Sequence, residues 1–177
     1  MGTAHRTVRK IKMRIVRETI EVESKGGRPT FHQITDQVRK IVSESEIKEG
    51  LCTVYSHHTT CSVVMQECSF DRTFTGLEYL QQDLCDVFEQ MIPTCRKEGQ
   101  YMHPGPELVK FSKEHGEEKE ETLNTDGHLR SMFMGRSESI IVMQGSLDLG
   151  SFGHLYFIDF DQTRGRKRQI QVQIMGE

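Results

Sequence analysis

Apolar and polar residues alternate near both ends of the chain, and a period of two is typical of half-buried β-strands. The pattern predicts a first strand over Arg9–Glu23. It predicts a last strand in which apolar residues alternate with glutamines, at Ile170, Val172 and Ile174. Branched and aromatic residues predict further strands over Leu51–Met65, Ile140–Met143, Leu147–Gly150 and Leu155–Asp161.

Apolar residues at helical spacing predict two main helices. The first opens at Thr35 and Asp36, where Thr35 is expected to be the N-cap. Its apolar stripe is Val38, Ile41 and Val42. The second ends before Pro93, and its apolar positions are Leu77, Leu80, Leu84, Val87, Phe88 and Met91. A short helix is expected over Gly127–Met134 and should end at Gly135.

The order of these elements favours an α+β fold, with largely antiparallel sheets packed against two main helices. A length of 177 residues suits one compact domain spanning 1–177. Residues 104–121 contain two prolines, two glycines and an acidic run, so they are predicted to form an inserted surface excursion.

Composition excludes several classes of protein. The net charge of −3 argues against electrostatic capture of nucleic acid. The basic cluster Arg164–Arg168 lies at a predicted turn, where it either binds a phosphate or blunts the end of a hairpin. The five cysteines have no C-x-x-C spacing, which disfavours a disulfide framework. No apolar run is as long as a membrane span, so we expect a cytoplasmic protein without a membrane partner.

Three histidines in polar settings are the main candidates for chemistry. His58 lies in the predicted strand, where alternation would place His58, Thr60 and Ser62 on one face. His103 lies in a loop, and His128 lies near the start of the short helix. Neutral imidazoles brought together by folding can hold a first-row metal with an open position. The alternative is three unrelated surface histidines, because no two have the spacing of a local metal motif.

Other polar residues would support such a site. The hydroxyls of Thr59, Thr60 and Ser62 could contact a phosphate or orient a ligand. Glu67 and Asp83 are the candidate catalytic groups for proton transfer. The alternative for both carboxylates is a solvated or ion-paired position, above all for Asp83 on its helix.

An ordered set of short motifs resembles the YjbQ-like family, also called the secondary thiamine-phosphate synthase family and long described as uncharacterised. The resemblance runs from the first strand to Glu177. Its motifs are His58-Thr59-Thr60-Cys61-Ser62, Glu67, Asp83-Leu84, Tyr101-Met102-His103, Asn124-Thr125-Asp126-Gly127-His128-Leu129, Gly135-Arg136-Ser137 and Gly176-Glu177.

The resemblance implies a homotrimer with a divalent metal, zinc in the first place, near a subunit interface. Its ligands would be His58, His103 and His128. It also implies a weak thiamine-phosphate synthase activity, which joins a pyrimidine pyrophosphate to a thiazole phosphate. The resulting hypothesis is a metal-dependent transferase or hydrolase acting on a small phosphorylated substrate. The alternative is a non-enzymatic trimeric binding module with a structural metal.

The chain departs from the family pattern in three places. The family's G-T-W-Q bend is replaced by Gly150-Ser151-Phe152-Gly153, which lacks the tryptophan and the amide. Asp159 stands where the family tends to have Glu. Extra residues precede the second main helix and lie between His103 and Asn124, so we expect altered access to the pocket.

Overall fold

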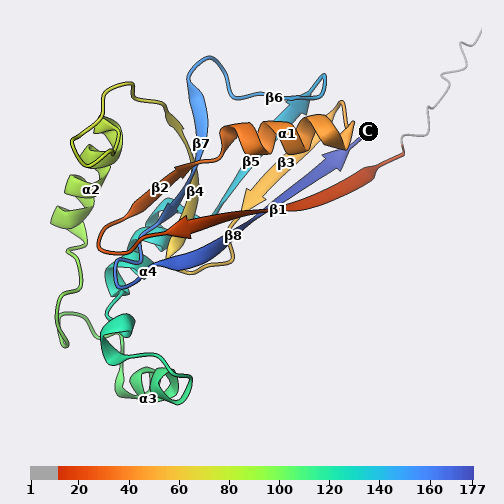
Figure 1. Cartoon of the computed structure of the whole chain (residues 1–177). Helices are drawn as coiled ribbons and strands as arrows, with labels where there is room; N and C mark the ends of the chain where they lie inside the picture. The colour runs from red at the N-terminus through yellow and green to blue at the C-terminus, as the bar shows by residue number, and fades with distance from the viewer. Residues whose placement is uncertain (1–11) are drawn as a thin grey trace, which may run out of the picture.

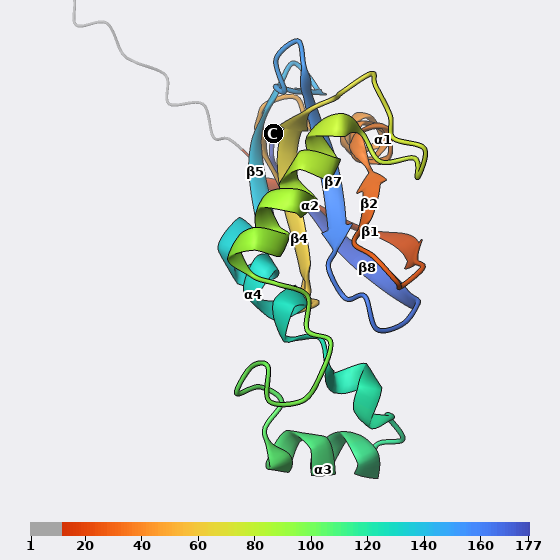
Figure 2. The ribbon, with the colours of Figure 1, turned by 90° about the vertical axis from the view of Figure 1, so that its left-hand side faces the viewer.

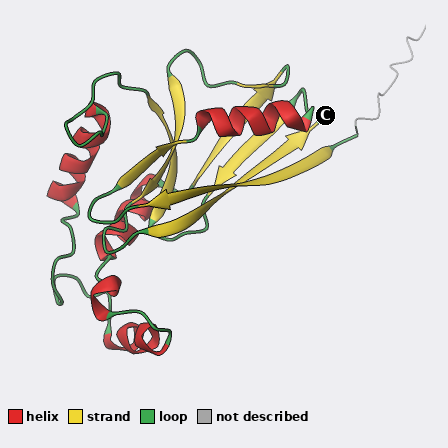
Figure 3. Ribbon diagram, in the orientation of Figure 1, coloured by secondary structure: helices red, strands yellow, loops and turns green. Residues whose placement is uncertain are grey.

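Two antiparallel sheets form the centre of the computed structural model, which describes residues 12–177 (Figure 3). The larger sheet has five strands in the order β1-β8-β3-β5-β6, and the smaller has the order β2-β7-β4. The elements are β1 (Arg14–Ser24), β2 (Thr30–Gln33), α1 (Thr35–Ser45), β3 (Gly50–Tyr55), β4 (Cys61–Glu67), α2 (Tyr79–Met91), α3 (Pro106–Glu114), the 3₁₀ helix η1 (Lys119–Thr122), α4 (Thr125–Met134), β5 (Ser137–Met143), β6 (Ser146–Leu147), β7 (Gly153–Asp159) and β8 (Arg166–Gly176).

Each main helix covers one sheet (Figures 1 and 2). Helix α1 lies on the five-stranded sheet and buries Val38 and Val42 in the larger hydrophobic cluster. Helix α2 packs Phe88 against apolar residues of the three-stranded sheet and its end, namely Val64, Tyr156, Ile158 and Phe160. Burial of these side chains is the main stabilising term in such a packing. The predicted α+β class with antiparallel sheets is confirmed, in a single compact domain.

The helices form where the periodicity predicts them, but their caps differ. Ile34 occupies the N-cap of α1, and Thr35 makes no capping bond. Its hydroxyl instead accepts the N–H of Leu155 at 2.9 Å, which ties the helix start to β7. Helix α2 begins with a capping box between Glu78 and Gln81, which the sequence analysis did not identify.

The prediction of one strand over Leu51–Met65 is wrong. The chain forms β3 in the larger sheet, leaves it, and returns as β4 in the smaller sheet. His58 therefore lies in the connecting loop, and the strand-face alternation through His58, Thr60 and Ser62 does not hold. The predicted first strand begins at Arg14, and its expected residues 9–11 lie outside the described residues.

The predicted excursion over residues 104–121 contains α3 and most of η1. Figures 1 and 2 both show α3 beyond the ends of the sheets, apart from α1 and α2. Only Ser112 of α3 is fully buried. In residues 12–177, none of the helices combines the length and the apolar composition needed to cross a lipid bilayer.

Gly50 and Gly176 face each other where β3 pairs with β8. A Cβ on Gly50 would lie 2.2 Å from the carbonyl oxygen of Met175, so no side chain fits there. We expect Gly50→Ala to lower the free energy of unfolding by about 1–3 kcal/mol, measured by urea denaturation. The control is Gly105→Ala, because a Cβ on Gly105 meets nothing within 4 Å. Equal losses in the two variants would contradict this assignment.

Candidate functional site

One cavity of about 310 Å³ collects the predicted histidines. His58 comes from the β3–β4 loop, His128 from α4 and His103 from the loop before α3, and all three line this cavity. The β7–β8 hairpin contributes Arg166 and Arg168 to its wall. The cavity therefore joins segments more than 100 residues apart along the chain, as His58 and Arg168 show.

His103 and His128 are neighbours, with ring centroids 5.2 Å apart. The Thr125 hydroxyl donates to the carbonyl oxygen of His103 at 2.6 Å and lies 3.0 Å from Nδ1 of the same residue. A hydroxyl has a single proton, so Thr125 must accept the hydrogen bond from a protonated Nδ1. The lone pair of neutral His103 is then on Nε2. A threonine that fixes the tautomer in this way is typical support for a ligand imidazole.

The other two imidazoles favour the neutral form. Burial lowers the pKa of His128, and the nearby His103 lowers it further. Burial also lowers the pKa of His58, with Arg168 as the next cause. His58 nevertheless has its Nε2 engaged, because this atom accepts the backbone N–H of Gln169 at 3.0 Å.

The fit of a metal ion to these side chains is therefore partial. Neutral imidazoles are suitable ligands for zinc. His103 uses its Nδ1–H in the hydrogen bond to Thr125, which leaves the lone pair of Nε2 for a metal. Among residues 12–177, however, no three His, Cys, Asp or Glu side chains are grouped as metal ligands. The hydrogen bond from the Gln169 N–H also occupies the lone pair on His58 Nε2 that a metal would need.

Arg168 forms the cationic floor of the cavity. Its side chain is 6% exposed and pairs with the fully buried Asp159, with Nε 2.6 Å from Oδ2. It also donates to the Thr60 hydroxyl at 3.2 Å and lies 3.5 Å from the Asp161 carboxylate. Burial alone would raise the pKa of Asp159, but hydrogen bonds and charge from Arg168 hold it below its ordinary value.

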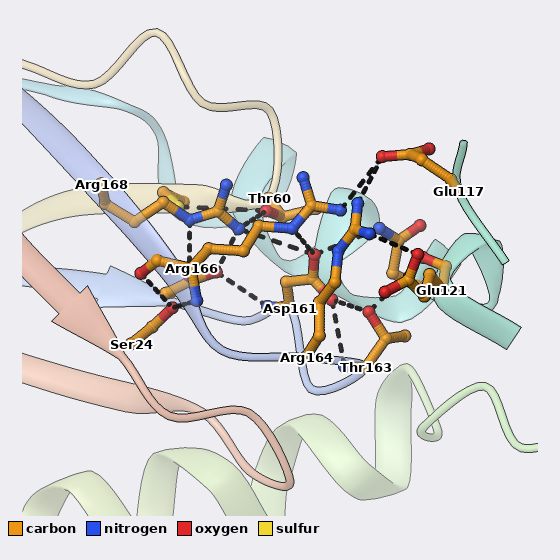
Figure 4. A network of polar contacts seen from close by, with 12 residues as sticks. Ser24, Thr60, Glu117, Glu121, Asp161, Thr163, Arg164, Arg166 and Arg168 are labelled. Atoms are coloured by element: carbon orange, nitrogen blue, oxygen red, sulfur yellow. Dashed lines mark hydrogen bonds and ion pairs between the residues drawn. The ribbon is translucent and has the colours of Figure 1, made fainter. Parts of the chain in front are cut away.

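The rim next to this floor is a network of opposite charges (Figure 4). Arg166 pairs with Asp161 at 3.4 Å and with Glu117 at 3.5 Å. Arg164 pairs with both Glu117 and Glu121. The rim thus contains carboxylates from the excursion and guanidinium groups from the β7–β8 hairpin.

Comparison with known proteins identifies the family. The model of the UPF0047, YjbQ-like protein family matches residues 18–177. The chain belongs to the YjbQ-like UPF0047 family. Among curated members, a UPF0047 protein of Methanothermobacter thermautotrophicus is 26% identical over 144 residues, covering 81% of each chain. YugU of Bacillus subtilis is 25% identical over 159 residues, covering 90% of this chain and 98% of YugU.

Solved structures of the YjbQ-like family share this fold. A YbjQ-like protein of Sulfolobus solfataricus superimposes with a TM-score of 0.71 at 25% identity, covering 94% of this chain and all of its own. A YjbQ/UPF0047 family protein of Clostridium acetobutylicum gives a TM-score of 0.64 at 28% identity, covering 88% and 98% of the two chains. The family name describes no reaction, so function has to be argued from the cavity.

The hydroxyl residues of the first YjbQ-like motif divide between two environments. Thr59 and Thr60 line the cavity. Ser62 does not line it, because β4 turns the Ser62 side chain toward α4, where its hydroxyl donates to the Ser131 carbonyl at 3.5 Å. Ser62 is therefore part of the packing between β4 and α4 rather than a ligand contact.

Glu67 and Asp83, the predicted catalytic carboxylates, are absent from the cavity lining. Glu67 is exposed at the far end of β4, and the seven residues of that strand span roughly 20 Å. Asp83 is exposed on the outer face of α2. Strand β4 runs away from the cavity, and Asp83 lies in the first half of α2, whose other end leads toward His103, so both carboxylates lie apart from the three histidines of their own chain.

Asp161 is a cavity carboxylate that the sequence did not reveal, as are Glu117 and Glu121. Its side chain accepts hydrogen bonds from the backbone and hydroxyl of Thr163, at 3.1 and 2.6 Å, and from Asn124 at 3.4 Å. The available signal was a pair of acids, Asp159 and Asp161, at the end of a buried strand and just before the basic cluster. Neither acid could be assigned to a site without the fold of the hairpin.

Proposed function

We propose that this cavity binds a small phosphorylated molecule together with a divalent metal, for which zinc is the first candidate. We propose further that the protein is a metal-dependent enzyme of the transferase or hydrolase class. One observation supports this most strongly. His58, His103 and His128 line the same cavity as two arginines, although the residues lie in distant parts of the sequence. A thiamine-phosphate synthase-type reaction is the specific activity proposed from the family resemblance.

The phosphate-binding part of the proposal rests on Arg166, Arg168 and the Thr59–Thr60 turn. A guanidinium group binds phosphate through paired hydrogen bonds, and hydroxyls add further donors. Arg168 is held in one orientation by Asp159, so its position does not have to be ordered when a ligand binds. Three carboxylates line the cavity, those of Glu117, Glu121 and Asp161, and Asp161 is our candidate for the general base.

The metal-binding part rests on the three histidines. His103 has a fixed tautomer with Nε2 as its acceptor, and burial favours neutral His128. His58 would join them by exchanging its bond from the Gln169 N–H for a bond to the metal. When bound, the metal would supply Lewis-acid polarisation of a phosphoryl oxygen or of water.

A row of exposed apolar residues supports self-association as a homotrimer. Four residues on neighbouring strands lie side by side in the larger sheet, in the order Ile15 of β1, Met175 of β8, Leu51 of β3 and Ile141 of β5. All four point away from the face that α1 covers, and each is between 38 and 57% exposed. Contiguous apolar surface of this kind is typical of a protein interface. We call this row the outer stripe.

Metal content tests the proposal. Protein purified without an affinity tag should contain about one zinc per chain by elemental mass spectrometry. We expect His103→Ala and His128→Ala to lose most of it, and His58→Ala to lose a comparable part. The control is His115→Ala, since His115 is exposed and absent from the cavity lining. Unchanged metal content in the cavity variants would refute the site.

The second candidate function is a trimeric binding module with a structural metal and no enzymatic activity. The absence of Glu67 and Asp83 from the cavity lining favours it, because two expected proton carriers are missing there. Removal of the metal by a chelator distinguishes the two. If the folded trimer survives and regains zinc, the site is open and the enzyme is favoured. If the trimer melts, the module is favoured.

A further inference from the structure

The excursion over residues 104–121 forms one wall of the cavity and lies apart from both sheets. Leu108, Ser112, Glu117 and Glu121 all line the cavity. Figures 1 and 2 show α3 beyond the ends of both sheets. A second hollow of about 560 Å³ lies on the other side of α3, between it and the loop that contains Tyr101 and Met102. A helix flanked by two hollows has little packing to hold it in place.

Ion pairs attach this wall to the body of the protein. Glu117 contacts Arg164 and Arg166, and Glu121 contacts Arg164 (Figure 4). The four side chains are between 25 and 34% exposed, so water screens these pairs and a competing anion can reach them. We call this set of ion pairs the latch.

Arg166 also has a poorly satisfied donor. Its Nε is buried and has no hydrogen-bond partner among residues 12–177, although it lies 3.4 Å from the Asp161 carboxylate. Buried donors are nearly always hydrogen-bonded in folded proteins, so the Arg166 guanidinium is not fully satisfied while the latch is closed. An anion in the cavity would bind the outer nitrogens of Arg166, one of which now pairs with Glu117 at 3.5 Å.

We propose that the excursion is a lid over the cavity, closed by the latch and opened by the phosphate group of the ligand. The phosphate replaces Glu117 and Glu121 on Arg164 and Arg166, because the guanidinium groups bind phosphate and carboxylate oxygens with the same geometry. A neutral ligand cannot make this exchange, so the latch selects ligands with a phosphate. This inference rests on the phosphorylated ligand of the proposed function.

Removing the two charges of the latch tests the lid. In Glu117→Gln/Glu121→Gln, we expect inorganic phosphate to bind about tenfold more tightly than in the wild-type protein by isothermal titration calorimetry, since competition from the carboxylates is lost. The matched control is Glu114→Gln/Glu120→Gln, which removes two exposed carboxylates of the same excursion that form no ion pair among residues 12–177. Equal phosphate affinity in the two double variants would overturn the lid.

Limited trypsin digestion gives a second readout, because Lys113 and Lys119 lie within the excursion. Phosphate should accelerate cleavage there several-fold in the wild-type protein, and the latch variant should be cleaved quickly without phosphate. Cleavage that phosphate slows or leaves unchanged would contradict an opening lid.

The two proposals can fail independently. Phosphate titrations of both double variants in a His128→Ala background separate them. A preserved difference in phosphate affinity supports the lid even where the metal site is lost. Failure of phosphate to bind any of these proteins overturns the lid and the phosphorylated ligand, and leaves the metal content to be judged by its own measurement.

Discussion

Arg168→Met should lower the free energy of unfolding by about 3–5 kcal/mol, because it leaves the buried carboxylate of Asp159 without its partner. The Arg168 and Asp159 side chains are 6% and 0% exposed, so solvent cannot replace the lost contacts. Guanidinium chloride denaturation at pH 7 measures the loss. Lys167→Met is the control, since Lys167 is the exposed neighbour on β8 and has no ion pair among residues 12–177.

Arg168→Met should also reverse the direction in which the Asp159 carboxylate changes stability with pH. In the wild-type protein the pKa of Asp159 is lowered from 3.8, so its contribution is present above that pH and is lost as the pH falls through the folded-state value. Without Arg168, burial dominates and the folded-state pKa should lie above 3.8. The variant should then become less stable as the pH rises from 4 toward neutrality. A wild-type-like pH profile in Arg168→Met would show that the pair contributes nothing.

Ile141→Glu should convert the proposed homotrimer into a monomer, measured as about a threefold fall in mass by light scattering. The substitution places a carboxylate at the β5 end of the outer stripe, on its most exposed member, and burying an unpaired charge in an interface costs several kcal/mol. The folded monomer should survive, because Ile141 is 57% exposed in the single chain.

Val87→Glu is the matched control for Ile141→Glu. Val87 is 49% exposed on α2, away from the outer stripe, so this change adds the same charge without touching the proposed interface. The outer stripe is not a subunit interface if the wild-type protein is already monomeric. The same holds if the Ile141→Glu protein keeps the wild-type mass.

The lid gives a physical meaning to the segment between His103 and Asn124. The family resemblance predicts altered access to a pocket there, and the structure places this segment beside the cavity, with two of its glutamates paired with the rim arginines. Access to the cavity then depends on a competition between anions, which salt and phosphate should both influence.

Local patterns predicted most of the elements. The strict alternation around Ile170 and Val172 predicted the strand that forms β8, and the helical spacing before Pro93 predicted the helix that forms α2. Such periods report which face of an element is buried, and that information is local. Of the apolar stripe predicted for this helix, however, Phe88 is buried while Leu80 is 44% exposed, because periodicity marks an apolar face but not how far the sheet covers it.

The residues of the candidate site were harder to predict because their partners are distant in sequence. Thr59, Thr60 and the three histidines were named from their polar settings and from the family motifs, and they meet at one cavity. Asp161 and the buried pairing of Arg168 were not recognised, because a charge cluster at a turn looks the same in sequence whether it faces solvent or a cavity.

By itself, the sequence determined the α+β class, the antiparallel strands near the C-terminus, the two main helices and the family, since each depends on short-range periods or on motifs in order. Only the tertiary structure decided that the chain leaves one sheet and enters the other between Tyr55 and Cys61, which removed His58 from a strand and placed it in a loop beside Arg168. It also decided that Glu67 and Asp83 lie outside the cavity. The physical reason is that sheet pairing and ion pairing are contacts between distant segments, and their energies depend on burial that no local pattern contains.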